Sequence, residues 1–355
     1  MNVTVYFAED LIAQILDRLS VKTLLRFRCV SKPWCSLIDS PHFARANLKR
    51  SIGCNTNTDL ILSGASSYWL CADSEDETTA IQIDETLRSP LLGTSLVGAC
   101  NGLLRCRKLP NAPSEYLHSI DVESFLFGFG YDSINDDYKV LSIFHPDGCD
   151  LAGSEVIIYS LKNNSWKRLQ NISPNFKFIH YYGLFLGGAL HCTTTKTLGS
   201  ESYQSIFAFD LAAENHREVP MPKVRINNPV GWSLCAFAES LSVLIVHPYV
   251  CIDVWLMNDY GVGSSWCKVF SVQHRGLIRS LMSVWPVAFS KSRECVLIKV
   301  IMNHIIWYDL ETKEMKTVKI ANMPDRFYYD LKVCSDYTES LVAPDCIASS
   351  EEKQP

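Results

Sequence analysis

Apolar residues recur at helical spacing near the start of the chain. Between residues 9 and 19 they stand three or four positions apart, on one face of a helix. Glu9 and Asp10 lie where acidic side chains interact favourably with the helix dipole. Ser20 and Ser31 each precede a further apolar run and can cap two more helices. The pattern therefore predicts three short amphipathic helices within the first forty or so residues.

These helices are too small to bury their own apolar faces. A unit of about forty residues usually needs a metal, disulfides or a partner to be stable. Residues 27–43, FRCVSKPWCSLIDSPHF, carry large apolar side chains in a piece that cannot cover them. Two explanations stay open from the residues alone. The helices dock on the rest of the chain, or they form a partner-binding module.

After residue 50 the pattern changes to short runs of β-branched and aromatic residues separated by turn formers. Four of these runs share one form: an aromatic strand ending in Asp-Leu or a near equivalent, a polar turn, and a second strand. The repeating positions are Leu161, Leu211, Met257 and Leu310. Their period of about 50 residues is typical of kelch-type propeller blades. Further strand-like segments between the hairpins would complete four strands per blade.

Four tryptophans fall within these repeats. They are Trp166, Trp255, Trp266 and Trp307. Because large aromatic side chains that recur with a repeat usually fill its core, we expect them to pack between blades and not to form a ligand site.

Charge and hydropathy exclude several classes of function. The chain has 355 residues, 47% of them hydrophobic, with a formal net charge of −5 and a pI near 6.0. It lacks the basic character that nucleic-acid binding requires. No apolar stretch reaches the roughly 18 residues of a membrane span, and the N-terminal residues do not resemble a secretory signal. We therefore expect a cytoplasmic or nuclear protein that binds neither nucleic acid nor membrane.

The fourteen cysteines indicate neither a disulfide framework nor a metal site. No two have the two-residue spacing of a zinc knuckle, and a reducing compartment keeps thiols free. No histidine pair stands at i, i+4 beside a glutamate. Asp132, Asp136 and Asp137 lack the spacing of a calcium loop and predict a turn. We expect mostly buried cysteines and no catalytic residue, cofactor or metal.

Residues 7–43 resemble an F-box, the helical module that docks the Skp-type adaptor of a cullin–RING ubiquitin ligase. The resemblance rests on Asp10-Leu11, ILDRL (15–19), VKTLLRFRCVSK (21–32), and Trp34 followed by Leu37-Ile38. It implies nine adaptor-binding residues: Phe7, Leu11, Ile15, Leu16, Leu19, Leu24, Val30, Trp34 and Leu37. The chain departs from the family pattern at Phe7-Ala8 and at Ser20, where the family carries Leu-Pro and Pro.

Most of residues 50–342 resembles the F-box-associated domain of plant F-box proteins. The matching segments include CNGLLRC (100–106), FGFGYDSINDDYKVLSI (127–143) and VIIYSLKNNSWKRL (156–169). The resemblance implies a kelch-like β-propeller. Between Cys106 and Phe127, an outer hairpin that the family carries is shortened or missing, so one early blade is expected to be irregular.

The expected fold is a small all-α F-box (1–48), a large all-β, kelch-like β-propeller with one irregular early blade (49–342), and a flexible tail (343–355). The resemblance implies a non-catalytic substrate receptor of a Skp–cullin–F-box ubiquitin ligase, with an unknown protein target. Two alternatives stay open: a degenerate receptor that does not recruit the ligase, and a propeller enzyme or lectin. Receptors of self-incompatibility and of immune regulation share these motifs, which do not distinguish the pathways.

We expect the target to bind rim loops, because loops can vary without disturbing the core. The least repeat-like segments are 108–124, 145–155 and 193–205, all rich in turn formers. The candidate contacts on them are Asn111, Glu115, Asp147, Asp150, Lys196 and Glu201. The acidic run at 73–77 is a further candidate surface for a basic target.

Overall fold

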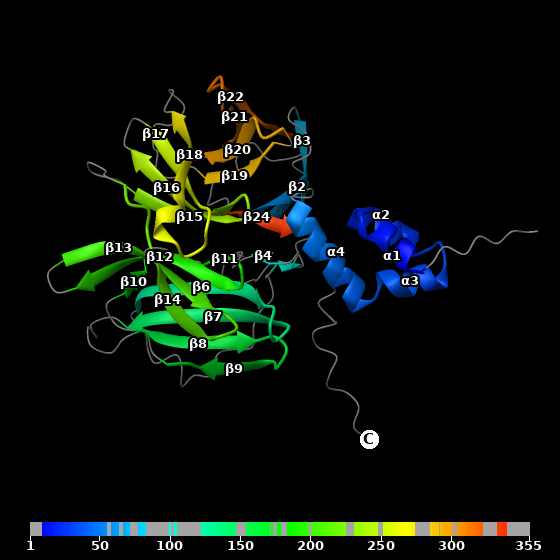
Figure 1. Ribbon diagram of the computed structural model, residues 1–355, viewed down its shortest axis with the longest axis horizontal. Helices are drawn as coiled ribbons and strands as arrows, with labels where there is room; N and C mark the ends of the chain where they lie inside the picture. Colours follow the sequence, from blue (N-terminus) through cyan, green and yellow to red (C-terminus); the bar gives the residue numbers. More distant parts are fainter. Residues whose placement is uncertain are drawn as a thin grey trace, which may run out of the picture.

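In the computed structural model, four helices precede a series of β-sheets (Figure 1). The prediction of a small all-α unit before a large all-β region is thereby confirmed. The structure describes residues 9–54, 58–63, 67–71, 77–82, 99–100, 103–104, 122–146, 154–170, 172, 176–178, 183–198, 201–224, 231–247, 251–273, 285–290, 292–300, 304–321 and 332–338. Within these ranges, no helix has the length and apolar character needed to cross a membrane.

The predicted helices begin where the sequence places their caps. The helices are α1 (Glu9–Asp17), α2 (Val21–Phe27), α3 (Lys32–Ile38) and α4 (Pro41–Cys54). At the start of α2 the Ser20 hydroxyl accepts a hydrogen bond from the amide of Thr23, at 3.4 Å. At the start of α3 the Ser31 hydroxyl accepts one from the amide of Trp34, at 3.3 Å. Each cap satisfies an amide that has no partner inside its own helix.

The fourth helix was not predicted, and the predicted domain boundary after residue 48 falls inside it. The side-chain amide of Asn47 donates to the carbonyl of Asp17 at 2.7 Å, which ties α4 to the end of α1. Arg50 forms an ion pair with the Asp17 carboxylate at 3.1 Å. The same helix contacts β24 (Lys332–Thr338), so it connects the helical unit to the sheets.

Four antiparallel sheets each come from one stretch of chain. The first consists of β6 (Val122–Asp132), β7 (Asp137–Pro146), β8 (Glu155–Ser160) and β9 (Ser165–Arg168). The second consists of β10 (Phe176–Phe178), β11 (Leu184–Leu186), β12 (Ala189–Leu198), β13 (Glu201–Asp210) and β14 (Asn215–Val219). The third consists of β15 (Gly231–Phe237), β16 (Ser240–His247), β17 (Cys251–Met257) and β18 (Trp266–Gln273). The fourth consists of β19 (Trp285–Phe289), β20 (Cys295–Val300), β21 (His304–Asp309) and β22 (Met315–Thr317).

A fifth sheet joins strands from both ends of the β region. Its order is β23 (Lys319–Ala321), β3 (Glu77–Gln82), β2 (Ser67–Cys71), β1 (Thr58–Ser63) and β24. The strand β1 pairs antiparallel with β24, and β3 pairs parallel with β23. Five sheets in series whose ends are joined in this way have the architecture of a propeller. A small hairpin of β4 (Ala99–Cys100) and β5 (Leu103–Leu104) precedes β6, and most of the predicted irregular hairpin lies outside the described residues.

The Asp-Leu repeat forms the tight turns between the third and fourth strands of a sheet. The carboxylates of Asp210 and Asp309 each accept hydrogen bonds from the amides two and three residues later, at 2.7 to 2.9 Å. In the first sheet Ser160 takes this place and accepts from the amide of Asn163 at 3.0 Å. Each turn ends on a residue with positive φ: Asn164, Glu214 and Lys313. The repeat thus encodes a turn, because the short polar side chain stabilises it locally.

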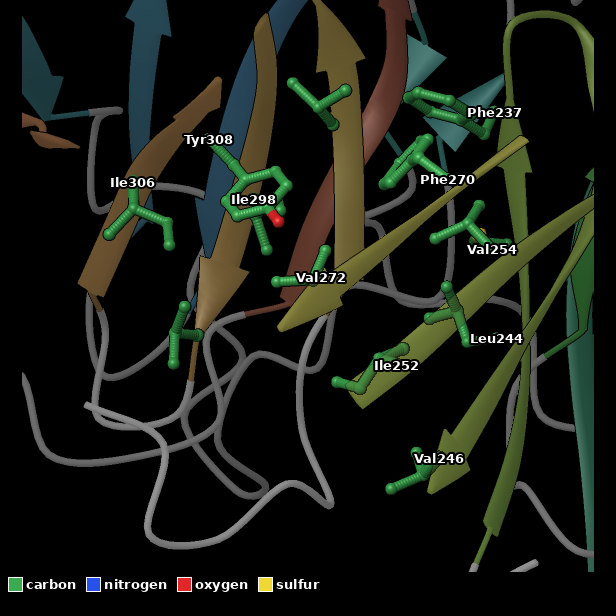
Figure 2. Close-up of a cluster of buried hydrophobic side chains, with 13 residues drawn as sticks. Phe237, Leu244, Val246, Ile252, Val254, Phe270, Val272, Ile298, Ile306 and Tyr308 are labelled. Atoms are coloured by element: carbon green, nitrogen blue, oxygen red, sulfur yellow. The ribbon is translucent and has the colours of Figure 1, made fainter. Parts of the chain in front are cut away.

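Apolar side chains fill the space between neighbouring sheets. One cluster joins the third and fourth sheets, whose side chains point toward one another around Phe237 and Tyr308 (Figure 2). A second joins the first and second sheets around Leu141 and Phe207. A third joins the second and third sheets and contains Trp266, whose indole nitrogen donates to the carbonyl of Pro220 at 2.8 Å. The core therefore runs from one sheet to the next.

The tryptophans and cysteines follow the predictions only in part. Trp255 and Trp266 pack in the cluster between the second and third sheets, and Trp307 is buried, whereas Trp166 packs against Tyr159 of its own sheet. The seven cysteines whose side chains the structure describes are free thiols, but only two of them, Cys192 and Cys235, are buried. The expectation of mostly buried cysteines is wrong for this part of the chain.

Candidate functional site

The helical unit has a small core of its own. The side chains of Leu16, Leu24, Ile38 and Phe43 are at most 4% exposed and pack together. Five further apolar residues cover this core in part: Ile12, Leu19, Phe27, Trp34 and Leu37. Because a core of this size covers only one side of each short helix, other apolar residues stay at the surface.

Four large apolar side chains of the helical unit are exposed. Leu11 and Ile15 on α1 are 50% and 55% exposed, Leu25 on α2 is 48% exposed, and Val30 is 59% exposed. Leu11 and Ile15 stand four residues apart and therefore lie on the same face of α1. We call these four the exposed helical residues. Apolar groups of this size gain free energy when a partner covers them, at about 25 cal/mol per Å².

The structure divides the nine predicted adaptor contacts into groups. Those at the surface are Leu11, Ile15 and Val30. Those half-buried at the edge of the helical core are Leu19, Trp34 and Leu37. Leu16 and Leu24 are fully buried inside the core, so they support the surface from behind. Phe7 lies outside the described residues. Leu25 was not singled out, because the spacing of apolar residues alone does not tell which face of α2 the core covers.

The helical unit also contacts the first four-stranded sheet. Arg45 on α4 forms an ion pair with Asp136 in the turn between β6 and β7. The hydroxyl of Tyr131 donates to the second oxygen of the same carboxylate at 2.5 Å. Burial, together with this hydrogen bond, raises the pKa of Tyr131 to about 12. Because both members of the ion pair are more than 40% exposed, the pair contributes at most about 1 kcal/mol and mainly sets orientation.

The contact at Asp136 identifies the rim of the sheets that faces the helices. In a series of antiparallel strands, alternate connections lie at the same end. The tight turns between first and second strands, and between third and fourth strands, therefore share this end, which we call the turn rim. The second strands end at residues 146, 198, 247 and 300, at the opposite end of the sheets, which we call the loop rim.

A polar cavity of about 400 Å³ opens at the turn rim between the first two sheets. The side chain of Lys139 is 8% exposed, and its ammonium lies 2.9 Å from Asp132 and 3.1 Å from Glu214. Burial alone would lower the pKa of Lys139, but these two carboxylates raise it above the ordinary value. Lys167 also pairs with Glu214, at 2.5 Å. These ion pairs tie the two sheets together.

The predicted target-binding segments have different outcomes. Segment 193–205 is not an irregular loop, because β12 and β13 pair without interruption up to Leu198 and Glu201. Only the expectation of a loop there is wrong, because the run of threonines is β-branched and favours a strand; target binding by this segment stays a prediction. Lys196 on this hairpin pairs with Glu218 at 2.7 Å. Of the candidate contacts, Asn111, Glu115, Asp147 and Asp150 lie outside the described residues, as does most of the acidic run.

The structure brings together three metal-ligating residue types that the sequence analysis did not connect. The donor atoms of His247, Cys251 and Asp253 lie within 4.8 Å of one another. The residues stand on adjacent strands, on either side of a short connection. In the sequence these residues form the pattern His-x3-Cys-x-Asp. A search for helical His and Glu spacing does not detect it.

Comparison with known families identifies both units. A family model described as the F-box associated beta propeller domain matches residues 88–344, and the F-box domain model matches residues 8–45. The chain is a plant F-box protein with an F-box-associated propeller domain. In this F-box protein, the helical unit that carries the exposed helical residues is the F-box, and the sheets are the propeller.

Curated relatives agree over nearly the whole length. The F-box protein is similar to F-box protein CPR1 of Arabidopsis thaliana, with 30% identity over 92% of this chain and 87% of the relative. A second Arabidopsis thaliana F-box protein is 26% identical over 88% of this chain and 85% of its own length. An F-box/kelch-repeat protein of the same plant is 27% identical over 78% of this chain and 81% of its own.

Among solved structures there is a weak similarity to a family 117 glycoside hydrolase of the marine bacterium Zobellia galactanivorans. It has 13% identity and a TM-score of 0.28, and it covers 59% of this chain and 56% of that chain. A similarity at this level supports no inference about activity.

Proposed function

We propose that this F-box protein is the substrate-recognition subunit of a Skp–cullin–F-box ubiquitin ligase. Its F-box would bind a Skp-type adaptor, and its propeller would bind the target protein. The observation that carries the proposal is the exposure of Leu11, Ile15 and Val30 on a helical unit that matches the F-box model. A ligase subunit of this kind would act in the cytoplasm or the nucleus.

The exposed helical residues can supply a large part of the adaptor affinity. Fully covering a Leu, Ile or Val side chain contributes roughly 1.5–3 kcal/mol. Leu11, Ile15 and Val30 are about half covered already, so each would contribute about 1 kcal/mol. Three such contributions change a dissociation constant by roughly a hundredfold. Leu16 and Leu24 would hold the helices in place behind these contacts.

The proposed role is non-catalytic. The propeller would raise the local concentration of target lysines near the ubiquitin conjugate, and proximity alone can supply a large rate effect. The charged groups of the turn-rim cavity support this role, because Lys139, Lys167 and Glu214 are already engaged with one another. The rival propeller enzyme would need an acid, a base or a nucleophile free to act on a substrate.

We infer that the target binds the loop rim. The helices contact the turn rim through Arg45 and Asp136, and short turns stabilised by their own side chains occupy that end. The connections after Pro146 and Leu198 belong to the opposite end, where two of the predicted target-binding segments lie. A target held there would face away from the F-box contact.

The deciding experiment is co-purification of the full-length protein with a Skp-type adaptor. The double variant Leu11→Asp/Ile15→Asp should weaken adaptor binding by about a hundredfold or more, because it places two charges where apolar burial is needed. The matched control is Ile134→Asp, which changes a side chain that is 81% exposed on the propeller. Circular dichroism and thermal unfolding would check that both variants fold.

Each result separates the proposal from its alternatives. Adaptor binding by the wild type and the control, with loss in the double variant, supports the ligase subunit. A wild-type protein that folds but does not bind any Skp-type adaptor would instead favour the degenerate receptor. Equal binding by the double variant would show that Leu11 and Ile15 are not the contact.

A further inference from the structure

The end of the β16–β17 hairpin brings a nitrogen, a sulfur and an oxygen donor together. His247 is the last residue of β16, and it pairs across the hairpin with Cys251, the first residue of β17. Asp253 follows two positions later and so shares a face of the strand with Cys251. The Nε2 atom of His247 lies 3.0 Å from Oδ2 of Asp253, and the Sγ atom of Cys251 lies 3.7 Å from Oδ1.

All three donor atoms lie within 4.8 Å of one another, so rotation of the side chains can bring them around one small cation. With bonds of about 2.0–2.3 Å, neighbouring ligand atoms around a tetrahedral zinc ion lie about 3.3–3.6 Å apart. Imidazole, thiolate and carboxylate are the three ligand types that zinc accepts in proteins. We propose that His247, Cys251 and Asp253 bind a zinc ion, with water as the fourth ligand.

Asp253 is the fixed member of this donor set. It is 6% exposed, and its Oδ1 atom accepts hydrogen bonds from the Ser271 hydroxyl at 2.6 Å and from the Lys268 ammonium at 3.0 Å. Burial opposes its ionisation, but these hydrogen bonds outweigh that effect and lower the pKa of Asp253. The carboxylate is therefore a preformed anion whose Oδ2 atom faces His247.

The thiol of Cys251 would exchange a proton for the metal. Burial, and then the charge of Asp253, raise the pKa of Cys251 above that of a free thiol. Zinc binds the thiolate, so coordination by Cys251 must release this proton to the solvent. Proton release provides a readout that a hydrogen-bonded cluster without metal affinity would not give.

Lys268 opposes a cation at this position. Its ammonium is held by the same carboxylate and would repel a metal ion from it. The side chain is 45% exposed on a flexible stem, so it can turn toward the solvent when the cation enters. The proposal therefore requires that removal of the Lys268 charge strengthens metal binding. If the cluster served only to support the hairpin, removal of the same charge would leave metal affinity unchanged.

The cluster lies at the loop rim, where β16 gives way to β17. A bound ion would fix the two strand ends beside the surface that the proposed function assigns to the target. The binding test below does not involve the adaptor or the target, so its failure would be distinct from failure of the proposed function.

The experiment uses the reduced full-length protein and cobalt(II) as the probe, because cobalt bound by a thiolate gives a charge-transfer absorption. One equivalent of cobalt should produce this band with release of about one proton, and zinc should then abolish the band by displacement. Cys251→Ser should remove the band. His247→Gln should weaken binding by more than about tenfold, a loss that even outer-shell changes can reach. Lys268→Met should tighten binding.

The matched control is Cys295→Ser. Cys295 faces Asp309 across β20 and β21 with Sγ 3.9 Å from the carboxylate, and in the described part of the chain no third donor gathers there. The control should keep the wild-type band and affinity. The proposal is overturned if the wild type gives no thiolate–cobalt band, if Cys251→Ser keeps it, or if Lys268→Met does not tighten binding while the thermal unfolding curve is unchanged. A wild-type protein that gives no band overturns the proposal even if a variant does not fold.

Discussion

The F-box and the propeller bury their apolar side chains to different extents. In the F-box a few residues around Leu16 and Leu24 form a core on one side of the helices, and Leu11 and Ile15 remain half exposed. In the propeller each sheet is covered by the next, and large side chains such as Phe207 are fully buried. The difference shows where partners are expected. A helical unit with incomplete cover offers exposed side chains to a partner, whereas we propose that the propeller recognises its target through loops.

The largest expected effect tests the completeness of the propeller core. Phe207→Ala should lower the free energy of unfolding by about 3–5 kcal/mol, because it opens a cavity between the first and second sheets. Val269→Ala is the control, since Val269 is 40% exposed on β18 and its truncation should cost less than about 0.5 kcal/mol. Urea unfolding followed by tryptophan fluorescence would measure both. Equal values for the two variants would show that the sheets do not share a core.

The second prediction concerns the pH dependence of stability and involves a residue of the propeller. His191 is 1% exposed, and burial lowers its pKa to about 4 from the ordinary 6.5. The unfolded chain therefore takes up a proton that the folded chain excludes, so the stability present above pH 6.5 is lost as the pH falls toward 4. The loss amounts to about 3 kcal/mol.

Unfolding measured between pH 7 and pH 4.5 would test this sign. In His191→Gln the pH dependence should become flatter, whereas His42→Gln, at an exposed position on α4, should keep the wild-type dependence. A protein that became more stable toward pH 4.5 would contradict the assignment.

A smaller effect is expected at a helix cap of the F-box. Ser31→Ala removes the acceptor for the Trp34 amide and should destabilise α3 by about 1 kcal/mol. Ser36→Ala, on the exposed side of the same helix, should not destabilise it. Hydrogen exchange of the α3 amides reports the change locally. Faster exchange in the Ser36 variant than in the Ser31 variant would exclude the capping role.

The smallest stability effect should come from a residue with a large effect on binding. Ile15→Ala should change the free energy of unfolding by less than about 0.5 kcal/mol, because the side chain is already 55% exposed. Leu16→Ala, one residue away, should cost about 2–5 kcal/mol, because that side chain is fully buried. Thermal unfolding of the two variants under the same conditions would distinguish a side chain that contacts the adaptor from one that stabilises the helical core. Similar losses in both would mean that the exposed face of α1 is packed in solution.

Local features of the fold could be predicted from the sequence because they depend on nearby residues. Ser20 and Ser31 cap the helices as their spacing indicates, and the Asp-Leu repeat marks the tight turns. The predicted period of about 50 residues corresponds to successive four-stranded sheets.

Features that depend on distant contacts could not be read in the same way. The F-box resemblance placed Leu11, Ile15, Leu16 and Leu24 in one set of adaptor contacts, but only packing decides that the last two are core. The threonines after Cys192 resemble a polar loop until the partner strand β13 is known. Likewise, His247 and Asp253 come together only because β16 and β17 pair in one particular register.

The pairing of β1 with β24 joins the first strand of the β region to its last, so this sheet is completed only after the chain has been synthesised. Thr58 pairs with Thr338. The strand β1 is synthesised first, and its neighbour β24 becomes available only after about 280 further residues. Contacts of such separation form late in folding, since the intervening chain must be ordered before the ends can meet. A premature stop or a proteolytic cut before residue 332 would leave one edge of β1 open, and an unpaired edge invites pairing with other chains. An incomplete copy of the chain would therefore expose one additional strand edge to such pairing.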